Sequence, residues 1–143
     1  VWTDSYARVM EHRLSTGETR MVLEDRLLAP MWSLELWENH AVWNVARPGE
    51  PRQIVLADLD TGEARELSPS SSAQEKPSIH NGRIAWGDER GGSHIRIHSL
   101  RTGREYDLGP SMIGSIPFIF DRTVVWMVDS AVGALWVTQI ADI

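Results

Sequence analysis

Two histidines on one predicted strand are the side chains whose spacing comes nearest to a metal site. His94 and His98 alternate with Arg96, so they share a strand face, and imidazole is a common zinc ligand. At a rise of roughly 3.3 Å per residue, however, the two histidines lie about 13 Å apart, too far to bind one zinc ion without a bend. We therefore expect both histidines to lie on a solvated strand face.

Acidic pairs at predicted turns could bind calcium through their carboxylates. These pairs are Asp58 with Asp60 and Asp88 with Glu89. Neither loop has the spaced run of oxygen ligands that an EF-hand-like site needs, and an aspartate before a turn usually caps the local backbone. We predict local capping, with no metal site and no cofactor.

The chain also lacks the patterns of common catalytic sites. It has no G-x-S-x-G, no Walker loop, no H-E-x-x-H and no cysteine. Serine, histidine and aspartate are present, but nothing in their spacing marks a triad. We assign no catalytic residue and favour a non-catalytic function, although an enzyme stays an open alternative.

Polar loops between predicted strands are the best candidates for a binding surface, because loops on a rigid scaffold often carry function. The loops concerned span residues 44–53, 88–93 and 128–133. Three tryptophans outside the repeated positions described below could also contact a ligand. The candidate binding residues are Arg47, Arg52, Asp88, Arg90, Trp32, Trp37 and Trp136. The alternative is that these loops are merely solvated.

A repeat of about 40 residues must position these side chains. Trp2, Trp43, Trp86 and Trp126 recur at spacings of 41, 43 and 40 residues, each after valine or alanine. A Leu-x-Thr-Gly turn follows the first three. The clearest copy, residues 77–108, contains Asn81-Gly82, a strong hairpin signal because both central residues of a type I′ turn need a positive φ.

Four short strands in each unit of this length are typical of a β-propeller, whose blades stack because none can bury its faces alone. We predict an all-β fold of four-stranded antiparallel blades, with repeats at 1–28, 29–68, 69–109 and 110–143. The repeated tryptophans then fill the spaces between blades. About three and a half blades are present, so we expect further blades or self-association to close the ring.

The best copy reads P-x-I-x-(N)G-x-(I/V)-(A/V)-W and then D-x-R-x-G-x-x-I-x-I-x-x-L-x-T-G. This pattern resembles the TolB-like propeller repeats of bacterial and archaeal exported and cell-surface proteins, although their Ser-Pro-Asp-Gly turn is reduced here to Asn81-Gly82. The resemblance implies an extracytoplasmic location and an interaction scaffold. The alternative that it implies is the propeller part of a secreted hydrolase or polysaccharide-active enzyme.

Composition narrows the class of partner. The formal net charge is −6, with acidic and basic residues interleaved, which disfavours nucleic-acid binding. No apolar run approaches the roughly 18 residues of a membrane span. We expect a protein or a polymeric ligand as partner, with a homo-oligomer as a further possibility.

Overall fold

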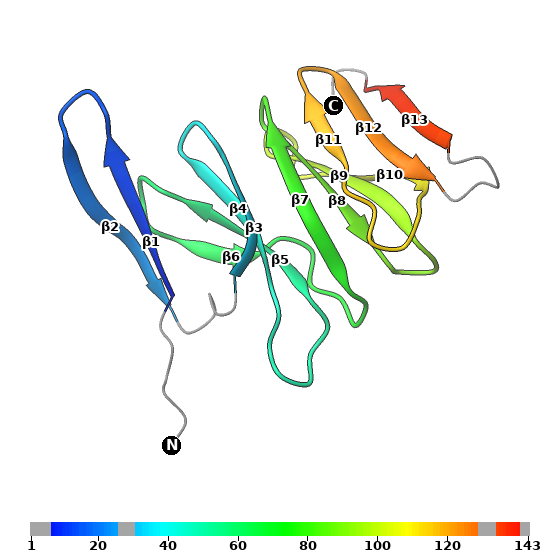
Figure 1. The fold of residues 1–143 in the computed structure, drawn as a ribbon, viewed down its shortest axis with the longest axis horizontal. Helices are drawn as coiled ribbons and strands as arrows, with labels where there is room; N and C mark the ends of the chain where they lie inside the picture. Colours follow the sequence, from blue (N-terminus) through cyan, green and yellow to red (C-terminus); the bar gives the residue numbers. More distant parts are fainter. Residues whose placement is uncertain (1–6, 26–30, 129–133, 141–143) are drawn as a thin grey trace.

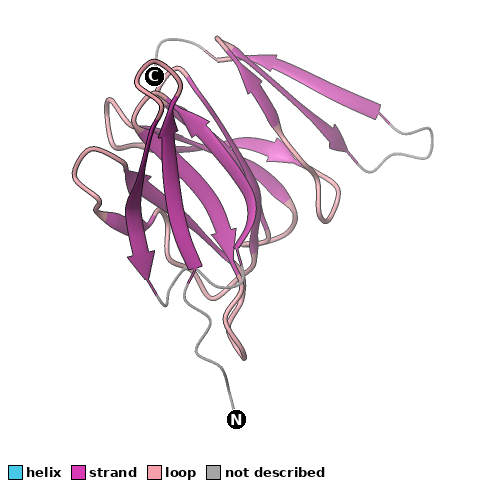
Figure 2. Cartoon of the chain, turned by 60° about the vertical axis from the view of Figure 1, so that its left-hand side comes forward, coloured by secondary structure: helices cyan, strands magenta, loops and turns pink. Residues whose placement is uncertain are grey.

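The computed structural model describes residues 7–25, 31–128 and 134–140, which form β-strands and their connections in four antiparallel sheets. The sheets follow one another in chain order, with β1 and β2 at one end and β13 at the other (Figure 1). Figure 2 shows the same strands from another side. Among the described residues there is no helix that could cross a membrane.

Consecutive strands pair within each sheet. The first sheet consists of β1 (Ala7–Arg13) and β2 (Glu18–Asp25). The second contains β3 (Met31–Trp37), β4 (His40–Val45), β5 (Gln53–Asp58) and β6 (Ala64–Glu66). The third contains β7 (Gln74–His80), β8 (Arg83–Asp88), β9 (His94–Ser99) and β10 (Glu105–Pro110). The fourth contains β11 (Phe118–Phe120), β12 (Thr123–Val128) and β13 (Ala134–Gln139). The predicted all-β class with four-stranded antiparallel sheets is confirmed.

The turns form where the sequence predicts them. Asn81 and Gly82 have φ angles of 47° and 67°, as a type I′ hairpin requires. The glycines of the Leu-x-Thr-Gly turns also adopt the left-handed conformation, which glycine reaches without a Cβ penalty. Their φ angles are 72° at Gly17, 74° at Gly62 and 68° at Gly103.

The core lies between neighbouring sheets, and the repeated tryptophans occupy it. Trp43 packs with residues of the first two sheets, Trp86 with residues of the second and third, and Trp126 with residues of the third and fourth. Each of these three side chains is at most 1% exposed. Trp2 lies outside the described residues. The prediction that the tryptophans pack between blades is confirmed for the three that are described.

Hydrogen bonds also connect the first strand of one sheet with the first strand of the next. The backbone N–H of Ile79 donates to Glu35 Oε2 at 3.3 Å, and that of Ile119 donates to Ser78 Oγ at 3.4 Å. Glu35 and Ser78 follow a register shift in their strands, β3 and β7. The third sheet also approaches the connection before β11 closely, since a Cβ added at Gly87 in β8 would lie 3.0 Å from the carbonyl oxygen of Ser115.

One sequence-based expectation about exposure is wrong. His98 is 7% exposed, because its face of β9 is turned toward the second sheet, so only His94 lies on a partly solvated surface. Gln74, at the start of β7, is also 0% exposed. Its side chain is buried because Oε1 accepts a hydrogen bond from the Ile54 N–H at 3.0 Å.

Candidate binding site between the second and third sheets

The arginines of the predicted binding loops form ion pairs within the protein. Arg47 binds Glu66 at 2.6 Å and Glu50 at 3.1 Å, and Arg52 pairs with Glu75. Burial opposes the charged form of Arg47, but both carboxylates outweigh it and raise the pKa of this guanidinium. These ion pairs therefore hold the loops against the sheet. Arg47 and Arg52 are engaged within the protein and are not free to bind a ligand.

Asp88 is the centre of a second ionic cluster. Its side chain is fully buried and binds the guanidinium of Arg90 at 2.7 Å, while the indole Nε1 of Trp86 donates to it at 3.0 Å. Arg90 also binds Glu105 at 2.7 Å, and Arg96 reaches the same carboxylate at 3.2 Å. The cluster joins the loop after β8 to β9 and β10. Asp88 Oδ1 also accepts a hydrogen bond from the Arg90 backbone N–H at 2.9 Å, so the predicted local capping is confirmed at this turn, whereas the ionic role of Asp88 and Arg90 was not predicted.

This cluster predicts acid sensitivity. Burial opposes ionisation of Asp88, but hydrogen bonds from Arg90 and Trp86 outweigh burial and hold the pKa of Asp88 below its ordinary value of 3.8. A carboxyl with a lowered pKa in the folded state stabilises the fold fully above its unfolded-state pKa, and this contribution is lost as the pH falls through the folded-state pKa.

We therefore expect the free energy of unfolding to fall as the pH drops below about 4, and to fall less in Asp88→Asn. Urea titrations across that range measure this. Asp58 and Asp107, whose pKa values are also lowered, keep part of the dependence in the variant. Identical pH dependence in both proteins would contradict the assignment to Asp88.

Of the three candidate tryptophans, the structure describes the side chain of one. The Trp37 ring stacks on His40, with centroids 6.4 Å apart and planes 19° from parallel, and it lies beside the Gly82 turn of the next sheet. The side chains of Trp32 and Trp136 lie outside the described part of the structure, as do residues 129–133 of the third predicted loop.

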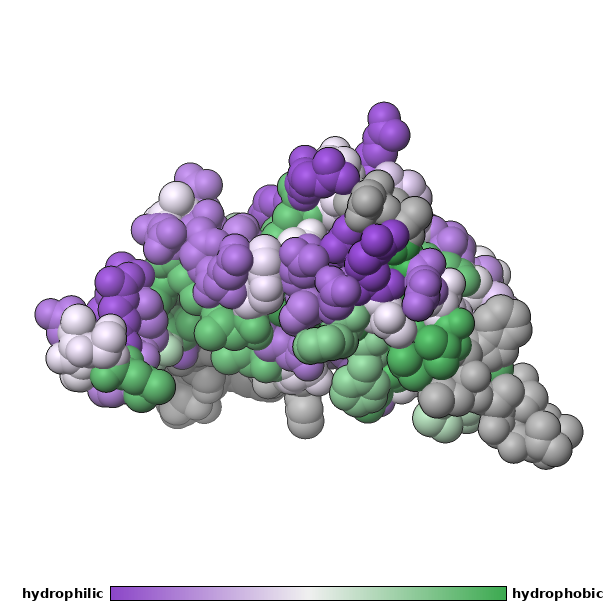
Figure 3. All heavy atoms as spheres, turned by 90° about the horizontal axis from the view of Figure 1, so that it is seen from above, coloured by the Kyte–Doolittle hydropathy of each residue, from purple (hydrophilic) through white to green (hydrophobic). Residues whose placement is uncertain are grey.

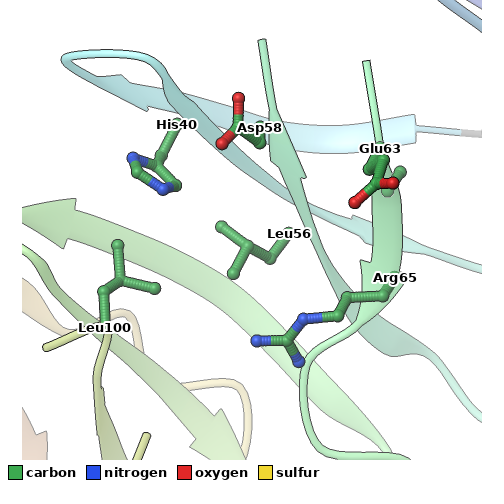
Figure 4. A pocket seen from close by; sticks show the side chains of 7 residues that line it. His40, Leu56, Asp58, Glu63, Arg65 and Leu100 are labelled. Atoms are coloured by element: carbon green, nitrogen blue, oxygen red, sulfur yellow. The ribbon is translucent and has the colours of Figure 1, made fainter. Parts of the chain in front are cut away.

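A pocket that sequence reasoning missed lies at the opposite end of the strands from the predicted loops. Its volume is about 490 Å³. His40 at the start of β4, Asp58 at the end of β5 and Arg65 in β6 contribute from the second sheet, and Leu100 contributes from the third (Figure 4). Leu56 supplies an apolar wall beside Leu100, and the remaining lining residues are Glu63 and Ala64. Residues distant in sequence meet here because two sheets pack against each other.

Several polar groups in this pocket have no partner among the residues that the structure describes. No hydrogen bond or ion pair engages the side chain of Glu63 or Arg65 there, and the buried Nδ1 of His40 is unpaired. Asp58 differs, because its Oδ1 accepts hydrogen bonds from the backbone N–H groups of Thr61 at 3.1 Å and Asp60 at 2.9 Å. These bonds hold the pKa of Asp58 low, and the predicted local capping is confirmed at this turn.

Arg65 also affects a buried neighbour. Burial lowers the pKa of His98, and the positive charge of Arg65 lowers it further, so the neutral imidazole is favoured. In the described ranges, no group of three metal-ligating side chains occurs. The pocket can therefore offer a guanidinium, a carboxylate and an imidazole nitrogen beside apolar carbon, a combination suited to binding a polar segment.

No protein-family model and no curated protein matches the chain. In structure, the chain is similar to the computationally designed Ika4 protein, with a TM-score of 0.65 and 17% identity over 94% of this chain and 80% of Ika4. It is similar to TolB from Acinetobacter baumannii, with a TM-score of 0.61 and 13% identity, covering 90% of this chain and 34% of TolB. For the designed Ika8 protein the TM-score is 0.63 and the identity 19%, over 87% of this chain and 38% of Ika8. These similarities show the fold, and they confirm the likeness to TolB at that level.

Proposed function

We propose that this chain is part of a non-catalytic β-propeller scaffold that binds a partner protein. The division into repeats at 1–28, 29–68, 69–109 and 110–143 is part of the proposal. An extracytoplasmic location is part of the proposal and rests on the resemblance of the repeats to the TolB-like family. The binding surface is the pocket that contains Glu63 and Arg65.

The observation that carries the proposal is the contrast between the two ends of the second and third sheets. At the end with the predicted loops, Arg47, Arg52 and Arg90 are all engaged in ion pairs within the chain. At the other end, Glu63 and Arg65 face a pocket, and their side chains form no hydrogen bond or ion pair with another described residue. Arg65 in β6 and Glu63 immediately before it are charged groups without an internal ion pair, so they are well placed to bind an external partner.

The chemistry of the pocket indicates the kind of segment that it binds. Glu63 and Arg65 are two positions apart along an extended segment, so their side chains can point to the same face. A partner segment with an acidic and a basic side chain two positions apart matches these two charges. Leu56 and Leu100 provide apolar surface for the carbon chains of that segment.

A titration with defined peptides tests the proposal. Capped peptides with a glutamate and a lysine two positions apart are added to isotope-labelled protein, and the amide signals of His40 and Arg65 are followed. A charge-assisted hydrogen bond contributes about 1.5–3 kcal/mol, so Arg65→Ala is expected to weaken binding about tenfold or more.

Arg8→Ala is the matched control, because it removes the same charge from an exposed position on the first sheet, where Arg8 pairs with Glu24. Binding should be nearly unchanged in that variant. The proposal fails if the peptides leave the pocket signals unmoved, or if Arg8→Ala weakens binding as much as Arg65→Ala does.

A further inference from the structure

The outward side of the fourth sheet is hydrophobic. Phe118, Met127 and Val137, which we call the trailing face, are 62%, 51% and 60% exposed. Phe118 and Met127 line an apolar hollow of about 290 Å³ together with Ile116. Figure 3 shows hydrophobic side chains at the surface of this half of the molecule. A group of exposed apolar side chains around a hollow is typical of an interaction surface.

The repeat indicates what covers this surface. Alignment of Trp86 with Trp126 pairs the trailing-face positions with Ser78, Gly87 and Ile97 of the third sheet. All three are buried: Ser78 and Ile97 lie against the fourth sheet, and Gly87 lies against the connection that leads into it. In the third sheet, the corresponding positions are covered from the side of the fourth sheet. The trailing face therefore occupies positions that a following propeller sheet would cover.

The outward side of the first sheet also carries exposed apolar side chains. Met10 and Met21, which we call the leading face, stand opposite each other in the register of β1 and β2 and are 54% and 51% exposed. Alignment of the turn glycines Gly17 and Gly62 pairs Met10 with Val55 in the second sheet, which is 3% exposed and packs in the cluster between the first and second sheets. Met10 thus occupies a position that contacts the preceding sheet of a propeller.

We propose that two copies of this chain associate head to tail, with the trailing face of each copy against the leading face of the other. Methionine side chains are flexible and adapt to irregular apolar hollows, which suits the leading face to this contact. Two contacts of the same kind close a cyclic dimer. Two copies of the four described sheets give eight, and closed propellers contain about four to eight blades.

Native mass in solution tests this association, measured by light scattering on a sizing column at micromolar concentrations. The wild-type 143-residue chain is expected to have twice the mass of one chain. Met127→Lys and Met10→Lys each remove one of the two contacting faces and should give monomers. Leu14→Lys is the matched control, because Leu14 is 92% exposed in the β1–β2 turn and belongs to neither face, so this variant should stay dimeric.

A mixture of the two monomeric variants provides the decisive measurement. Met10→Lys keeps an intact trailing face and Met127→Lys keeps an intact leading face, so the mixture is expected to form a heterodimer through one wild-type contact. Met127→Thr and Met10→Thr test the same two faces without introducing a charge. Threonine suits strand positions, so these variants are expected to fold and to weaken the dimer. A monomeric wild type overturns the proposal, as would a mixture without heterodimer. If Met10→Lys remains dimeric, the contact is not head to tail.

Discussion

Replacing Trp86 with alanine is expected to lower the free energy of unfolding by about 3–5 kcal/mol, the usual range for removing a large buried aromatic side chain. Trp86 is 0% exposed and packs with Val42, Ile54 and Ile84 between the second and third sheets. The substitution leaves a cavity there and removes the hydrogen bond from Nε1 to Asp88. Urea denaturation at a fixed protein concentration measures the loss, because association would make stability depend on concentration.

Trp37→Ala serves as the comparison. Trp37 is only partly buried at the margin of the same cluster, so its replacement should cost clearly less than that of Trp86. Trp86→Phe keeps most of the apolar volume and should fall between the wild type and Trp86→Ala. Equal losses for Trp86→Ala and Trp37→Ala would show that the repeated tryptophan does not fill the space between sheets as described.

Replacing Asp88 with alanine is expected to cost about 3 kcal/mol, because removing one member of a buried ion pair leaves its partners unsatisfied. Trp86 Nε1 loses its acceptor, and Arg90 loses one of its two carboxylates. Glu105 still pairs with Arg90, which limits the loss. Thermal and urea unfolding of the variant measure the change.

Glu24→Ala is the matched control for Asp88→Ala. Glu24 pairs with Arg8 at 2.8 Å on the surface of the first sheet, and exposed pairs of this kind contribute about 0–1 kcal/mol. If both carboxylates prove equally dispensable, the cluster around Asp88 is an incidental surface network and the acid sensitivity predicted for it should also be absent.

The sequence predicted the fold because the signals for it are local or periodic. Asn81-Gly82 specifies its turn through the φ angles that only certain residues adopt readily, and the spacing of Trp43, Trp86 and Trp126 specifies the repeat. Neither signal depends on knowing how two sheets pack. The predicted all-β class and the buried tryptophans could therefore be read from the chain directly.

The candidate pocket could not be predicted in the same way. His40, Arg65 and Leu100 come from different strands of two sheets, and no spacing along the chain relates them. The loop arginines misled for a similar reason, since carboxylates such as Glu66 and Glu75 that neutralise them are distant in sequence. The burial of His98 likewise depends on the neighbouring sheet. Side-chain pairing across sheets is a tertiary property that local patterns do not contain.

The hydrogen bonds from Ile79 to Glu35 and from Ile119 to Ser78 bear on how the molecule unfolds. In repeat proteins, the strength of nearest-neighbour coupling decides whether units melt singly or together. Here the second and third sheets each supply an acceptor to the backbone of the next sheet in addition to apolar contact, so opening one of them exposes an amide of its successor. The energetic unit is therefore a sheet with its neighbour, and the second, third and fourth sheets are expected to open together.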